Sequence, residues 1–97
     1  MKNCNCHKIK KRHASEKRLL ANRLARIEGQ IRGLRGMLEA DAYCPDLLLQ
    51  ASATRAALDA FSREILASHI RTCVSEDIRA GKEETVDELL DVLRKMM

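Results

Sequence analysis

The stretch that decides the fold is residues 44–73, which read CPDLLLQASATRAALDAFSREILASHIRTC. Pro45 stands in the first turn of a predicted helix, where its missing N–H costs nothing. From Asp46 to Ala80 there is no glycine and no proline, and Gly81 then offers a left-handed helix stop. The pattern predicts one helix of about 36 residues, roughly 54 Å long at ~1.5 Å rise per residue.

This helix is too long to be covered by its own chain, because a compact domain of about 100 residues has a radius of gyration of only ~13 Å. Its apolar residues also lie on more than one face. They are Leu48, Ala51, Leu58, Phe61 and Ile65 on one side and Leu49, Ala53, Ala56, Ala60, Ala67, Ile70 and Val74 around another. Such breadth predicts packing on a partner subunit as well as on the first helix.

His69 and Cys73 lie four residues apart, the spacing at which one helical face presents two ligands to a metal. Cys44 is a third soft ligand, but it lies 25 residues before His69 (44 against 69), roughly 37 Å away along the axis. Two such helices packed antiparallel in a dimer bring the start of one beside the end of the other. The residues therefore predict two metal sites shared between subunits, with an accidental His/Cys pair as the alternative interpretation.

Composition indicates one small helical domain. The chain has 97 residues, 45% of them apolar and 2% aromatic, so the core must be aliphatic and gains from oligomerisation. No signal peptide and no membrane span are expected. In a chain of this kind the four cysteines, Cys4, Cys6, Cys44 and Cys73, are expected to be cytosolic thiols, metal ligands or redox sensors rather than disulfides. No motif of an enzyme appears.

The formal net charge of +4 hides an asymmetry. Residues 1–37 carry 11 Lys/Arg against 2 acids (+9), and residues 38–97 carry 7 against 12 (−5). This predicts a polyanionic partner for the first third, with a solvated charged face as the alternative. The scarcity of aromatic residues disfavours stacking on single-stranded bases and favours double-stranded DNA. The candidate phosphate contacts are Arg18, Arg23, Arg26, Arg32, Arg55 and Arg63.

Residues 1–14 are predicted to form a flexible basic arm, and residues 15–97 the helical metal-sensing and DNA-binding domain. In the arm, Cys4, Cys6 and His7 are either auxiliary metal ligands or incidental.

The first helix is expected to start with Ser15 as N-cap and Glu16 in its first turn. A further amphipathic helix is predicted over Glu83–Met97. In the first helix, apolar residues recur every three or four positions as a seam: Leu20, Leu24, Ile27, Ile31, Leu34 and Leu38. Three glycines there predict close helix–helix approach, since each costs about 1 kcal/mol relative to alanine. They are Gly29, Gly33 and Gly36.

Three motifs together carry a family resemblance. Residues 23–30 (RLARIEGQ), the connection Ala42-Tyr43-Cys44 and the pair His69-x-x-x-Cys73 resemble the CsoR/RcnR family of bacterial metal-sensing repressors. The resemblance spans roughly residues 17–95. It implies an all-α protomer of three helices with a long central one, an antiparallel dimer and a tetramer made of two dimers. It also implies binding of operator DNA without a helix-turn-helix and release on the cognate signal.

Within that family, the set Cys44, His69 and Cys73 resembles the copper-sensing branch. Two thiolates and one imidazole suit three-coordinate Cu(I), whereas Zn(II) favours a fourth ligand. As outer partners of His69, the resemblance implies Tyr43 and, allowing a one-residue gap, Glu88.

Three alternatives stay open at this point. The first is a sensor of Ni(II), Co(II) or Zn(II) that uses the N-terminal arm. The second is a thiol or persulfide redox-sensing repressor of the same fold, in which the cysteines react covalently. The third is a cytosolic copper carrier with no DNA role, which the basic first helix disfavours.

Overall fold

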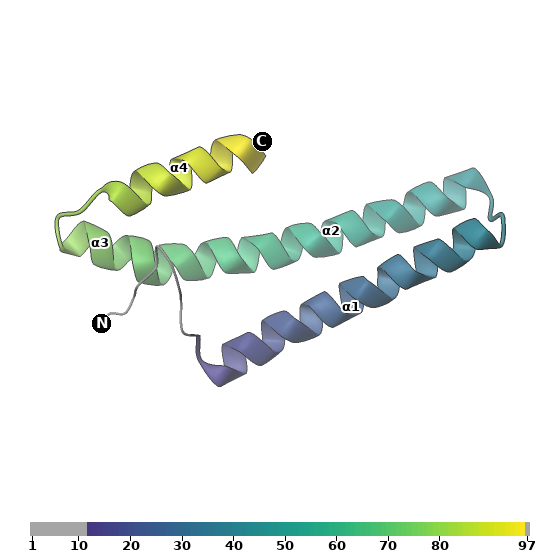
Figure 1. The fold of residues 1–97 in the computed structure, drawn as a ribbon, viewed down its shortest axis with the longest axis horizontal. Helices are drawn as coiled ribbons and strands as arrows, with labels where there is room; N and C mark the ends of the chain where they lie inside the picture. The colour runs from purple at the N-terminus through teal and green to yellow at the C-terminus, as the bar shows by residue number, and fades with distance from the viewer. Residues whose placement is uncertain (1–11, 97) are drawn as a thin grey trace. The chain divides into compact units, whose positions relative to one another are not determined.

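The computed structural model describes residues 12–96, so the predictions for Cys4, Cys6 and His7 lie outside the described residues. All regular secondary structure in the described chain is helical, and these residues contain no strand (Figure 1). Its elements are α1 (Ala14–Glu39), α2 (Cys44–His69), the π-helical turn η1 (Ile70–Val74), α3 (Ser75–Arg79) and α4 (Glu84–Met96). The all-α prediction is confirmed.

The long central helix has the predicted extent but not the predicted regularity. Segments α2, η1 and α3, of 26, 5 and 5 residues, follow one another without a break and total 36. Gly81 ends the path with φ at +78°, the left-handed conformation that favours glycine. The prediction of a single regular α-helix is therefore wrong. The π turn arises from a different choice of backbone hydrogen bonds, which no glycine or proline announces.

Helix α1 begins two residues earlier than expected. His13 is the N-cap and makes no side-chain capping bond, so the prediction of Ser15 as N-cap is wrong. The Lys17 N–H donates to the His13 carbonyl at 2.9 Å, and an Arg12–Glu16 ion pair at 3.7 Å joins successive turns. These contacts stabilise the earlier start. The predicted place of Glu16 in the first turn is confirmed.

The chain divides into two compact units, one of which is Arg12–Glu64. In it, α1 and the first part of α2 run side by side as a helical hairpin (Figure 1). Only Ile27 of the predicted seam is fully buried, at 6% exposure. Half of that seam remains exposed in the single chain, namely Leu24, Ile31 and Leu38. A hairpin alone does not bury the apolar surface that its sequence carries.

The second unit contains Ile65–Met97. After the turn at Gly81, α4 folds back against η1, and it starts within one residue of the prediction. Its buried centre consists of Ser68, Cys73, Val74 and Thr85. The Thr85 hydroxyl has no hydrogen-bond partner among the described residues, a cost of about 1–3 kcal/mol. None of the described helices is long and apolar enough to cross a bilayer.

Candidate metal and DNA-binding sites

The predicted ligand pair His69 and Cys73 lies within the second unit. His69 is the last residue of α2 and is half-buried, and Cys73 lies in η1 with no exposed surface. The turn that joins them is π-helical rather than α-helical. The spacing predicted from the sequence is thus present, on a wider turn than the sequence indicated.

Two residues with hydroxyl groups, Thr72 and Ser75, lie on either side of Cys73, and sequence reasoning missed both. The Thr72 hydroxyl lies 2.7 Å from the Ser68 carbonyl oxygen and 3.6 Å from Cys73 Sγ. The Ser75 hydroxyl donates to the Ile70 carbonyl at 2.8 Å, and the Ser75 backbone N–H bonds to the same carbonyl. Hydroxyl residues on both sides of Cys73 were the available signal, because serine and threonine compete for helix carbonyls.

The third predicted ligand, Cys44, is the first residue of α2 and carries an exposed free thiol. Cys73 is disulfide-bonded in this structure, so the expectation of thiols, metal ligands or redox sensors rather than disulfides is wrong for this residue. Within residues 12–96, no group of three or more His, Cys, Asp or Glu side chains is arranged to hold a metal. One chain brings His69 and Cys73 into one unit and leaves Cys44 at the far end of α2.

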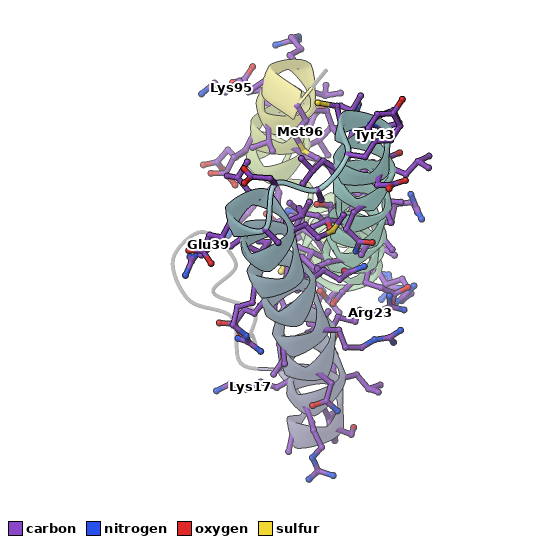
Figure 2. The ribbon with its side chains drawn as sticks, turned by 90° about the vertical axis from the view of Figure 1, so that its right-hand side faces the viewer. Lys17, Arg23, Glu39, Tyr43, Lys95 and Met96 are labelled. Atoms are coloured by element: carbon purple, nitrogen blue, oxygen red, sulfur yellow. The ribbon has the colours of Figure 1, made fainter. Side chains whose placement is uncertain are left out.

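The two implied outer partners of His69 are both exposed. Tyr43 precedes α2, and its carbonyl accepts the N–H groups of Asp46 and Leu47 at 3.0 and 3.2 Å. Tyr43 is 73% exposed, and its side chain points outward at the start of that helix (Figure 2). Glu88 lies on an exposed part of α4. Both residues were proposed as partners of His69 from the family resemblance, and residue spacing alone did not indicate them.

The six candidate arginines share three properties. All belong to the unit Arg12–Glu64, all are exposed, and none forms an ion pair with another described residue. Figure 2 shows Lys17 and Arg23 extending from different sides of α1. The predicted cationic residues therefore remain available to an anionic partner. They are Arg18, Arg23, Arg26 and Arg32 on α1 and Arg55 and Arg63 on α2.

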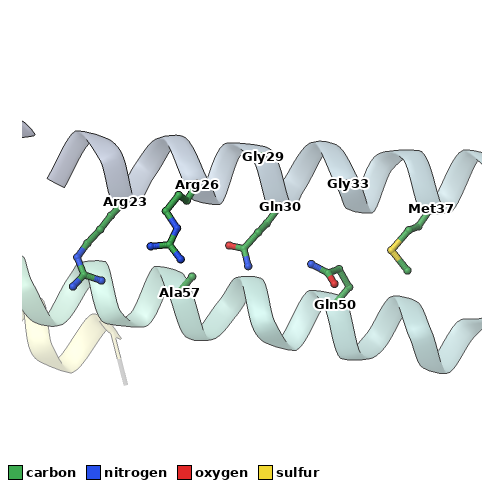
Figure 3. Close-up of a pocket in the computed structure, with 8 residues that line it drawn as sticks. All are labelled: Arg23, Arg26, Gly29, Gln30, Gly33, Met37, Gln50 and Ala57. Atoms are coloured by element: carbon green, nitrogen blue, oxygen red, sulfur yellow. The ribbon is translucent and has the colours of Figure 1, made fainter. Parts of the chain in front are cut away.

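Two of these arginines line a groove of about 680 Å³ between α1 and α2 (Figure 3). Its other lining residues include Gln30 and Gln50, and no lining residue is a carboxylate. The prediction that α1 closely approaches another helix at its glycines is wrong within the single chain. A Cβ added at Gly33 would meet nothing within 4 Å, and the same holds at Gly36. Gly33 instead lines the open groove, into which the labelled amide and guanidinium side chains point (Figure 3).

Comparison with known proteins places these features in a family. Residues 16–95 match the family model described as a metal-sensitive transcriptional repressor. The chain belongs to this family. The copper-sensing transcriptional repressor CsoR of Bacillus subtilis (strain 168) is 42% identical over 97 residues, covering 98% of this chain and 96% of that protein. The resemblance to the CsoR/RcnR family is thereby confirmed.

Two solved structures extend the comparison to the fold. The copper-sensing repressor CsoR with Cu(I) from Geobacillus thermodenitrificans NG80-2 gives a TM-score of 0.86 at 39% identity and covers 91% of this chain and 93% of its own. The nickel-responsive transcriptional regulator InrS gives 0.73 at 35% identity, with 94% and 100% covered. The two solved structures thus share this helical fold, and their names give copper for one and nickel for the other.

Proposed function

We propose that this protein is a copper-sensing transcriptional repressor of the cytoplasm, which binds operator DNA in its metal-free form and releases it on binding Cu(I). The observation that carries the proposal is the placement of the ligands. His69 and Cys73 share one unit, and Cys44 begins the same helix that His69 ends. Each metal site then combines Cys44 of one chain with His69 and Cys73 of another, in an antiparallel dimer that pairs into a tetramer.

The donor set fits Cu(I). Two cysteine sulfurs and one imidazole form a soft, low-coordinate set, and Cys73 lies where water is excluded. A bound Cu(I) ion would bind the thiolates of both chains and so link them. Cys73 has to be reduced before its sulfur can serve as a ligand, because only the thiolate binds metal. Tests of metal binding therefore belong under reducing, anaerobic conditions.

The exposed apolar side chains support the assembly. Leu48 and Leu49 on α2 are each 70% exposed in the single chain, and Leu58 is 47% exposed. Large apolar side chains exposed in such number on one helix are expected at an interaction site. A second α2 helix packed antiparallel would cover it and would bring each Cys44 beside the partner chain's metal-binding unit.

The proposed DNA surface combines the exposed arginines with the groove between α1 and α2. Arg23, Arg26, Gln30 and Gln50 line that groove, without a carboxylate among the lining residues. Guanidinium and amide groups are donors to phosphate oxygens. The absent side chain at Gly33 leaves room for an incoming backbone. This surface provides the cationic contacts that a repressor without a helix-turn-helix requires.

The function is tested by DNA binding with and without metal. A fluorescent duplex from the promoter region upstream of the coding sequence is titrated with reduced protein, and fluorescence anisotropy reports the affinity. Cu(I) is expected to weaken binding by about 10- to 100-fold, within the range of ordinary allosteric coupling. Ni(II) and Zn(II) at equal occupancy serve as controls. Unchanged affinity with Cu(I), or equal release by Ni(II), would contradict the proposal.

The DNA surface is tested by the salt dependence of binding. Arg23→Ala and Arg26→Ala are each expected to weaken binding and to reduce the slope of log K against log salt by about one unit, because each lost phosphate contact releases fewer counterions. The matched control is Arg94→Ala, since Arg94 is already paired with Asp91 at 2.6 Å. An unchanged slope in both α1 variants would place the DNA surface elsewhere.

One observation favours a second candidate function. Cys73 is disulfide-bonded in this structure, so its sulfur forms a covalent bond of the kind that thiol sensors use. A repressor that senses oxidants or polysulfides would use that chemistry, with His69 incidental. The same anisotropy titration separates the two functions: a thiol sensor releases DNA on polysulfide treatment and ignores Cu(I).

A further inference from the structure

We infer that Ser75 is a positioning residue that holds the π turn between His69 and Cys73 and so sets how these two side chains face a common metal. The inference rests on the proposed Cu(I) site and adds a residue to it. Ser75 itself is not a ligand. It acts through the backbone of the turn that carries Cys73.

The hydrogen bonds of Ser75 are those of a wide turn. In an α-helix its N–H would bond to the carbonyl of Arg71, four residues back. Here that N–H is shared between the carbonyl of Ile70, five residues back, and the carbonyl of Thr72, three residues back. The Ser75 hydroxyl donates to the same carbonyl at 2.8 Å. Two donors of one residue thus converge on the acceptor that defines the π turn.

The number of residues that the Ser75 hydroxyl bond spans differs from that of two other hydroxyl bonds in the chain. Serine and threonine hydroxyls in helices ordinarily bond to a carbonyl three or four residues back. Thr54 does so within regular α2, at 3.0 Å from the Gln50 carbonyl, and Thr72 does so beside the site. The bond of Thr72 is therefore compatible with either helix type. The bond of Ser75, which spans five residues, is the one that distinguishes the π turn.

The π turn changes the relative direction of the two ligand side chains. A turn closed by i→i+5 bonds advances less per residue than an α turn, so Cys73 points at a different angle around the axis relative to His69. Cys73 and Val74 are buried, and α4 packs on η1. The backbone geometry of this turn therefore affects both the relative orientation of the two ligands and the packing of α4.

The test compares Ser75→Ala with Ser75→Thr, which keeps a hydroxyl, and with Ser52→Ala, which alters an exposed serine in α2. In the reduced, metal-free protein, amide hydrogen exchange at Ser75 is expected to be faster in Ser75→Ala by about 2- to 10-fold, the worth of one hydrogen bond. Cu(I) affinity, measured against a chromophoric chelator, is expected to fall by a similar factor. Ser75→Thr and Ser52→Ala are expected to match wild type in both measurements.

The inference is overturned by a folded Ser75→Ala protein with wild-type exchange and Cu(I) affinity, or by equal losses in Ser75→Thr or Ser52→Ala. Should Ser75→Ala fail to fold, the isosteric pair Ser75→Thr and Ser75→Val decides it through the same two measurements. The proposed metal site has its own test. Wild-type Cu(I) affinity in Cys73→Ser refutes the site, whereas its loss there with no effect at Ser75 refutes only the positioning role.

Discussion

Mixed dimers of Cys44→Ser and Cys73→Ser chains are expected to recover one Cu(I) site per two chains, although neither variant alone binds Cu(I) tightly. Loss of an outer partner of a ligand typically costs 10- to 100-fold in metal affinity. Loss of a thiolate ligand should therefore cost more than about 100-fold. In the mixed dimer one site loses both thiolates, and the other keeps the intact Cys44 together with the intact Cys73.

The measurement uses the two variants with different affinity tags, co-expressed and purified through both. Cu(I) is titrated anaerobically with reductant, since Cys73 has to be a thiol to bind. The matched control is a mixed dimer of wild type with the double variant Cys44→Ser/Cys73→Ser. Sites shared between chains leave that control with no intact site, whereas sites within one chain leave it with one. Tight Cu(I) binding by the control, without recovery in the first mixture, would show that each site lies within one chain and would contradict the shared site.

The extent of the long helix could be predicted from the sequence because its two ends depend on single residues. Pro45 suits only the first turn of a helix, and Gly81 adopts a positive φ that other residues avoid. The start of α1 could not be predicted in the same way. It is fixed by a backbone bond from Lys17 to His13 and an Arg12–Glu16 ion pair, which compete with the side-chain cap that Ser15 would provide.

The candidate site was predictable in its residue types and less so in its geometry. The four-residue spacing of His69 and Cys73 identifies the pair on any helix. The π turn between them depends on one hydroxyl reaching Ile70, which the order of residues does not reveal. The oxidation state of Cys73 likewise depends on conditions rather than on sequence.

For the DNA surface, charge counting found the exposed arginines. It did not find the groove, because that requires knowing which faces of α1 and α2 meet.

A His69→Ala variant is expected to keep most of its affinity for Cu(I) and to lose most of the response of DNA binding to the metal. The two thiolates of Cys44 and Cys73 supply the greater part of the affinity for a soft ion. A ligand shifts an equilibrium only through its different affinity for two states, so tight binding alone releases no DNA. In the proposed mechanism, His69 at the end of α2 provides that difference. One ring nitrogen would hold the metal, and the other would donate to an outer partner, for which Tyr43 and Glu88 are the candidates.

The measurement is the ratio of DNA affinities of the metal-free and Cu(I)-loaded protein at one salt concentration. Wild type is expected to give a ratio of about 10 to 100, and His69→Ala a ratio below about 3. The matched control is His13→Ala, which removes an exposed imidazole at the start of α1 and should leave the ratio at the wild-type value. The hypothesis fails if His69→Ala, saturated with Cu(I), releases DNA as fully as wild type. In that case the thiolates alone would transmit the signal, and the π turn that carries Cys73 would be the element through which they act.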